Sequence, residues 1–179
     1  MDDLIARLTE DHPGYENLIS QVTSLVTTYP PPFIYINDPT TPRIASSILR
    51  SILSGCSKLP LSASPEIRFA HVDVVACFTA RVFYDTVLNA MAQWPVRWED
   101  GCENWSDDES GKIWNDSVDA FMHGLKAVYA AMGKGTSRMV LAVDKAERLK
   151  ETLPDLVVPL TRLAELVSLP ISPSFRCPA

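Results

Sequence analysis

An apolar run that ends in an acid is the strongest chemical signal in this sequence. Residues 138–149 read Arg-Met-Val-Leu-Ala-Val-Asp-Lys-Ala-Glu-Arg-Leu. A continuous apolar run is typical of a buried parallel strand, and Asp144 follows it directly. Open α/β sheets bind ligands at the carboxyl ends of their strands, and in nucleotide-binding folds such an acid helps to hold Mg²⁺ opposite a phosphate loop. Asp144 is therefore the candidate metal ligand if ATP with Mg²⁺ binds.

A structural role competes for the same residue. Asp144 and Glu147 have the spacing of a capping box, with Asp144 as the N-cap of the following helix and Glu147 at its third position. The two roles are compatible, and the residues alone favour capping.

The phosphate loop belongs about a hundred residues upstream, between a strand and a helix. A working loop reads G-x-x-x-x-G-K-[ST]. Placing that pattern on the chain without gaps puts Ile36 and Thr41 at the two glycines, Pro42 at the Lys and Arg43 at the Ser/Thr. These four residues, with Asp144, are the candidate nucleotide-binding residues.

The chemistry of this segment departs from a phosphate loop at every required position. Ile36 does not readily adopt the positive φ that glycine allows, and Pro39 and Pro42 remove two N–H donors. Arg43 replaces only part of the missing lysine charge. The alternative is that Thr41 caps a helix with Pro42 at its first position. We expect no cofactor, although ATP with Mg²⁺ stays possible.

Strand and helix patterns alternate along the chain. Short runs rich in β-branched and aromatic residues predict strands, and the segments between them have the apolar spacing of amphipathic helices. The expected strands are 33–36, 68–75 and 139–143, and the expected helices are 16–29, 44–53, 78–91, 114–129, a short one through 149, and 156–167. This alternation predicts an α/β fold with a parallel sheet. We expect the fold to be incomplete at the C-terminus and 170–179 to be an irregular tail.

Composition narrows the class of protein. The 179 residues, 46% of them hydrophobic, suit one globular domain. No run of 18 apolar residues occurs, so we expect no membrane partner. The N-terminus lacks a signal-peptide pattern, which favours the cytosol or nucleus. The four cysteines form no C-x-x-C pair, so buried thiols are expected rather than zinc ligands or disulfides.

The net charge of −6 comes from one segment. Residues 98–110 contain six acids and no Lys or Arg, which predicts a solvated acidic insertion. Without it, acidic and basic residues are equal in number. No basic footprint for nucleic acid is visible, so any work on DNA is expected within a larger assembly.

Several fragments, taken in order, carry a family resemblance. They are Phe-Ile-Tyr at 33–35, the run 72–81 with Leu-Asn at 88–89, Asp-Lys-Ala-Glu at 144–147 with Leu149, and the run 160–166. Together they resemble subunit 5 of the eukaryotic origin recognition complex. Pro13-Gly14 and the helix after it also resemble the N-terminal segment of that family. The match covers about 11–169, and the order and spacing of the fragments carry it.

The resemblance implies an AAA+ type P-loop domain, a three-layer sandwich, over residues 1–169. In that family the protein is one of six subunits of a nuclear complex that marks replication origins and helps to load the replicative helicase. The implied partners are the other subunits, with origin DNA contacted through the complex. Lys145 stands where active AAA+ enzymes have a catalytic Glu, so together with the lost phosphate loop the resemblance implies no hydrolysis.

Three functions are compatible with these observations. The first is a non-catalytic assembly subunit of the origin recognition complex. The second is an ATP-binding regulatory module with a distorted loop, which would use the Pro13-Gly14 segment, Arg43 and Asp144. The third is a truncated product that has no function.

Overall fold

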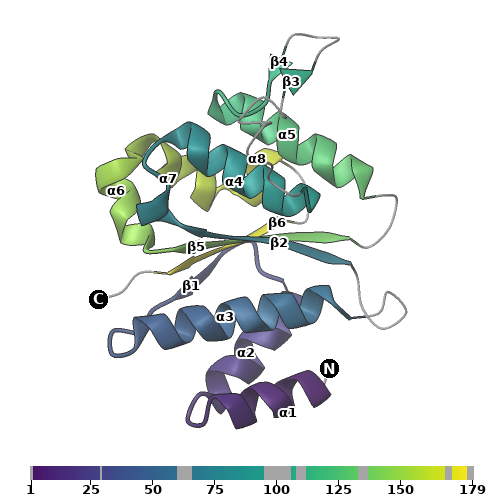
Figure 1. Cartoon of the computed structure of the whole chain (residues 1–179), viewed down its shortest axis with the longest axis vertical. Coiled ribbons are helices and arrows are strands. Elements are labelled where there is room, and N and C mark those ends of the chain that lie inside the picture. The colour runs from purple at the N-terminus through teal and green to yellow at the C-terminus, as the bar shows by residue number, and fades with distance from the viewer. Residues whose placement is uncertain are drawn as a thin grey trace.

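A four-stranded parallel sheet lies between two layers of helices in the computed structural model (Figure 1). The structure describes residues 2–28, 30–59, 66–94, 106–107, 112–132, 137–167 and 171–176. The strand order is β1-β6-β5-β2, with β1 at Ile34–Ile36, β2 at Ile67–Asp73, β5 at Arg138–Asp144 and β6 at Ile171–Arg176. All three pairings are parallel. The expected three-layer α/β sandwich is confirmed.

Each face of the sheet has its own helices. Figure 1 shows α1 (Asp2–Asp11), α2 (Glu16–Thr27) and α3 (Pro42–Ser57) below the sheet. The other face carries α4 (Ala80–Ala92), α5 (Val118–Ala131), α6 (Leu149–Thr152), α7 (Pro154–Thr161) and α8 (Leu163–Val167). Two 3-10 turns, η1 (Val74–Ala76) and η3 (Ala146–Arg148), follow β2 and β5. Strands β3 (Ser106–Asp107) and β4 (Lys112–Ile113) pair antiparallel in a separate two-stranded sheet.

Strand β5 connects the two hydrophobic cores. Its five central residues are all buried. Met139, Leu141 and Val143 enter the core on the α4 side, whereas Val140 and Ala142 enter the core on the α3 side. Alternate side chains therefore point to opposite faces and both faces are apolar, which is why the run is continuous in the sequence.

Arg138 ties the helical layer to the start of β5. Its Nη1 donates hydrogen bonds to the carbonyl oxygens of Val26, at 3.2 Å, and Thr27, at 2.6 Å. These carbonyls lie in the last turn of α2 and have no further helical turn to accept from. A cation there also meets the negative end of the helix dipole.

The segment expected to be an irregular tail contains a strand. Residues Ile171–Arg176 form β6, which pairs with β1 on one side and with β5 on the other. Pro173 concealed this strand in the sequence because proline cannot donate to the ladder. The backbone on either side of Pro173 pairs with two neighbouring strands, which compensates for the missing proline N–H. The sheet therefore has four strands rather than three.

Other expectations differ in detail. Helix α1 has no counterpart in the expected set, and the single helix expected at 156–167 is two helices that break at Arg162. Cys56 and Cys77 are free and buried as expected, and burial raises the pKa of the Cys56 thiol to about 11. Most of the acidic insertion, with Cys102 and Cys177, lies outside the described residues. No helix in the described ranges is long and apolar enough to cross a bilayer.

The contact between α1 and α3 generates the first prediction. A Cβ on Gly55 would lie 2.5 Å from Leu4 Cδ1, and Leu4 is buried. We expect Gly55→Ala to destabilise the chain because the buried Leu4 side chain must shift to make room. In a Leu4→Ala background, itself less stable by about 2–5 kcal/mol, the same change should stabilise it by up to ~1 kcal/mol through helix propensity. Urea unfolding of the four chains measures both effects.

Ser47→Ala is the matched control for that cycle, because Ser47 is an exposed residue of the same helix. It should have the same small effect in both backgrounds. An equal effect of Gly55→Ala with and without the Leu4 side chain would contradict the proposed close packing.

Candidate functional site

A cavity of about 560 Å³ lies at the carboxyl ends of β2 and β5, where α3 begins. This is the edge at which open α/β sheets bind ligands. The residues that line it are Pro42, Arg43, Ser46, Asp73, Val75, Asp144, Lys145, Glu147 and Arg148. Three of them are carboxylates and three are cations, so the lining has no excess of positive charge for a phosphate chain.

Asp144 is held by side chains from two other elements. Ser46, on α3, donates a hydrogen bond from its hydroxyl to Asp144 Oδ2. His71 Nε2, on β2, lies 3.2 Å from the same oxygen. The expected capping box is wrong: Asp144 is the last residue of β5, and Lys145 occupies the N-cap position of η3, where its side chain caps no helix N–H. The carboxylate bonds across the sheet instead of along the chain.

These three side chains do not form a nucleophile relay. In a Ser-His-Asp triad the two imidazole nitrogens serve different partners, one the serine and the other the acid. Here His71 Nε2 faces both Asp144 Oδ2 at 3.2 Å and Ser46 Oγ at 3.4 Å. Ser46 also donates directly to the acid, so its proton is not directed at the imidazole.

Lys145, which the family resemblance placed at the position of a catalytic Glu, is paired with Asp73. Its Nζ lies 2.6 Å from Asp73 Oδ2, and both side chains are partly exposed. Asp73 ends β2 opposite Asp144 in the sheet register, and its other oxygen accepts the backbone N–H of Val75 at 2.9 Å. Lys145 has a φ of 56°, a left-handed conformation that costs a non-glycine residue about 1–2 kcal/mol. The strand-to-turn junction holds it there.

In the segment expected at the phosphate-loop position, the Asp38 carboxylate accepts the local N–H groups. Asp38 Oδ1 accepts the backbone N–H groups of Thr40 and Thr41, at 3.1 and 3.0 Å. The same two residues donate their hydroxyls to Asp38 at 2.9 and 2.8 Å. These hydrogen bonds, those of Thr41 first, lower the pKa of Asp38 to about 2. An internal anion thus takes the donors that a phosphate would need.

Thr41 takes the expected position but not the expected bond. It is the N-cap residue of α3 with Pro42 in the first turn, yet its side chain caps no helix N–H. Its hydroxyl donates to Asp38 Oδ2 and is also hydrogen-bonded to the hydroxyl of Tyr15. The N-terminal segment therefore reaches this loop through Tyr15 rather than through Pro13 or Gly14.

The structure brings together only some of the predicted site residues. Pro42, Arg43 and Asp144 line the cavity, whereas Ile36 packs in the α3-side core and Thr41 faces Asp38. Sequence reasoning missed Ser46, which carries no local signal. Asp73 carried a weaker local signal, since it ends a strand of alternating burial, whereas Asp144 ends a continuous apolar run.

The described residues do not fit ATP with Mg²⁺. Two loop N–H groups are used by Asp38, and Pro39 and Pro42 supply none. Asp144 already accepts from Ser46, and the described residues contain no cluster of His, Cys, Asp and Glu suited to a metal ion. A bound phosphate chain would have to displace the Asp38 carboxylate.

Comparisons with known proteins support the fold. No family model and no curated protein matches the sequence. The whole chain is similar to part of a chain in a structure of the Drosophila origin recognition complex bound to DNA, with a TM-score of 0.72 and 21% identity. Over 93% of its length it resembles the ORC2 protein of Aeropyrum pernix, solved in ADPNP and ADP complexes, with a TM-score of 0.63 and 9% identity.

The domain therefore has the AAA+ fold found in origin recognition complex proteins. The chain spans 41% of the length of each of these two structures' chains.

The second prediction concerns Asp38. Replacing Thr41 with Val removes a hydroxyl donor but keeps the backbone N–H, so the pKa of Asp38 should rise from about 2 toward 3.8. A carboxyl with a lowered pKa contributes stability above its unfolded pKa and loses it as the pH falls through the folded value. The wild-type contribution should therefore fade between about pH 4 and pH 2. NMR titration of the side-chain carboxyl carbon measures the shift.

Thr152→Val is the control, because that hydroxyl donates to the carbonyl of Arg148 in another part of the chain. It should leave the Asp38 titration unchanged. An unaltered Asp38 pKa in Thr41→Val would show that the hydroxyl is not a ligand of the carboxylate.

Proposed function

We propose that this chain is a non-catalytic AAA+ subunit of an origin recognition complex and acts in the initiation of DNA replication. The sequence fragments that resemble subunit 5 support that particular place in the complex. In this proposal the protein works in the nucleus, contacts the other subunits, and meets origin DNA as part of the complex. It hydrolyses no ATP.

The filled phosphate loop is the observation that carries the non-catalytic part of the proposal. Asp38 bonds the loop's own N–H groups, and Lys145 forms an ion pair with Asp73 at the position of the catalytic Glu. In this proposal, neither arrangement supports ATP hydrolysis. A domain kept in this form serves through its surface rather than through turnover.

An exposed apolar edge beside the cavity supports the assembly role. Val75, which lines the cavity, is 57% exposed, and Phe78, three residues further on, is 78% exposed. Large apolar side chains gathered at one edge favour a protein partner. The similar Drosophila structure is of a multi-subunit complex bound to DNA.

Affinity purification of the tagged chain from its own cells, with mass spectrometry, tests the proposal. We expect other origin recognition subunits to co-purify. Asp144→Asn should leave their recovery unchanged, because the amide oxygen still accepts from Ser46. Phe78→Asp should reduce recovery at least fivefold, the factor for about 1 kcal/mol of lost contact.

Val158→Asp is the matched variant, since Val158 is also an exposed apolar residue, 64% exposed, but lies on α7 away from the cavity. It should co-purify like the wild type. Absence of all other subunits from the wild-type sample, with the chain expressed and folded, would overturn the proposal.

The cavity supports a second candidate, an ATP-binding regulatory module. Its volume of about 560 Å³ is within the range of small-molecule sites, and Arg43 and Arg148 line it. Saturating ATP with Mg²⁺ at about 100 times its Kd would add roughly 2.7 kcal/mol, which raises the melting temperature of a domain this size by about 5–10 °C. We expect no such shift.

Two variants decide between the candidates if a shift occurs. Arg43→Ala and Asp144→Asn should abolish a rise caused by binding in this cavity, whereas Arg81→Ala, an exposed change on α4, should not. The same melting curves address the truncated-product hypothesis. Two buried cores predict one cooperative transition, and a broad, non-cooperative melt would favour a product that does not fold.

A further inference from the structure

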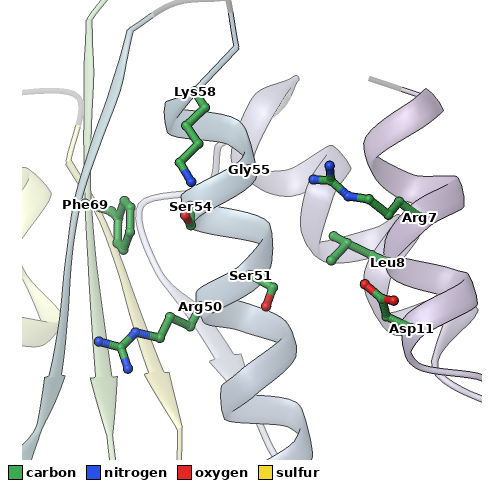
Figure 2. A pocket seen from close by; sticks show the side chains of 9 residues that line it. All are labelled: Arg7, Leu8, Asp11, Arg50, Ser51, Ser54, Gly55, Lys58 and Phe69. Atoms are coloured by element: carbon green, nitrogen blue, oxygen red, sulfur yellow. The ribbon is translucent and has the colours of Figure 1, made fainter.

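A second cavity lies far along α3 from the first and shares no lining residue with it. Its volume is about 450 Å³, and it is an open groove between α1, α3 and the edge strand β2. Figure 2 shows the side chains that surround it. Arg7, Leu8 and Asp11 come from α1, and Phe69 comes from β2.

Three cationic side chains line the groove, and none of them has an ion-pair partner within the described residues. Arg7 lines it from α1, and Arg50 and Lys58 line it from α3 or its end. None of the three forms an ion pair with any residue that the structure describes. Asp11 is the one acid among the lining residues. The groove therefore has a net positive charge on a chain whose net charge is −6.

Four other described cations are paired with carboxylates. Arg68, Lys145, Arg148 and Arg162 each pair with a carboxylate within 3.0 Å. Placing three unpaired cations around one hollow creates mutual repulsion, which an anionic ligand would relieve. This contrast separates the groove from the charge-balanced cavity at the strand ends.

Small residues keep the groove open. Between the cations, α3 presents Ser51, Ser54 and Gly55 to the hollow (Figure 2). Gly55 lets α1 approach, since a Cβ there would lie 2.5 Å from Leu4 Cδ1. The two serine hydroxyls add neutral hydrogen-bond donors to the three cations. Carboxylates bind to such a mixture of charged and neutral donors.

We propose that this groove binds an acidic peptide segment of a partner protein, with Arg7, Arg50 and Lys58 pairing with Asp or Glu side chains of that segment. The groove is open rather than enclosed, and Figure 2 shows Arg7 reaching from α1 toward α3, with Arg50 and Lys58 on the side of α3 toward Phe69 of β2. That arrangement suits a narrow chain that crosses α3 between α1 and the edge strand β2. The site is independent of the proposed nucleotide-free AAA+ role.

Nucleic acid fits the groove less well. Duplex DNA needs a broad basic face, whereas the three cations of this groove stand beside Asp11, and α1 also carries Asp2, Asp3 and Glu10 outside the lining. Single strands are held by bases that stack on exposed aromatic rings. Phe69, the one aromatic residue in the lining, is half-buried and packs against the α3-side core.

Fluorescence anisotropy with the full chain tests the proposal. The probe is a short fluorescein-labelled peptide of Asp and Glu, and its matched partner has Asn and Gln in their place. At low salt, we expect the acidic peptide to bind and the amide peptide not to bind. Arg7→Ala, Arg50→Ala and Lys58→Ala should each weaken binding by about fivefold, the effect of one exposed ion pair of about 1 kcal/mol.

Asp11→Asn gives a result in the opposite direction. Removing the one acid of the lining should tighten binding of the acidic peptide about twofold to fivefold, which loss of structure would not do. Arg81→Ala and Lys126→Ala, exposed cations on α4 and α5, are controls and should bind like the wild type. Circular dichroism melts of every variant check that it is folded.

Three results would overturn the proposal. One is equal binding of the acidic peptide by the groove variants and the two controls. Another is tighter binding of a single-stranded oligonucleotide of equal charge, which would make the groove a nucleic-acid site. The third is displacement of the peptide by an equal concentration of inorganic phosphate, which would make it a small-anion site.

Discussion

The burial of β5 on both faces is the constraint on which the rest of the structure depends. Its five central side chains enter two separate cores. Burial of each large apolar side chain stabilises the fold by roughly 1.5–3 kcal/mol. Both helical layers must therefore cover the sheet. The strand pairs with β2 over its whole length and with β6 on its other edge, so no backbone group at the centre depends on solvent.

The two ends of β5 are polar, and each end holds a different part of the molecule. Arg138 bonds the last carbonyls of α2, and Asp144 accepts from Ser46 on α3 beside His71 on β2. The candidate site thus belongs to the framework of the fold. Through the hydrogen bond from Ser46, Asp144 joins α3 to the sheet.

The loop before α3 is likewise held by its own polar groups. Asp38 supplies the negative charge that a phosphate would bring, and the Thr40 and Thr41 N–H groups are satisfied without a ligand. Such a loop is stable in the ligand-free state, whereas a glycine-rich loop leaves its donors open. The domain has the AAA+ fold, and Asp38, Thr40 and Thr41 bond one another in the loop before α3.

The sequence by itself determined the fold class, the strand that ends in Asp144, and the loss of glycine and lysine from the loop, because periodicity and side-chain chemistry are local. Only the tertiary structure decided that residues 171–176 complete the sheet and that Ser46, 98 residues away, bonds Asp144. It also decided that Arg7 and Lys58 share one groove. Such pairings depend on how strands and helices pack across long sequence separations, which no local pattern records.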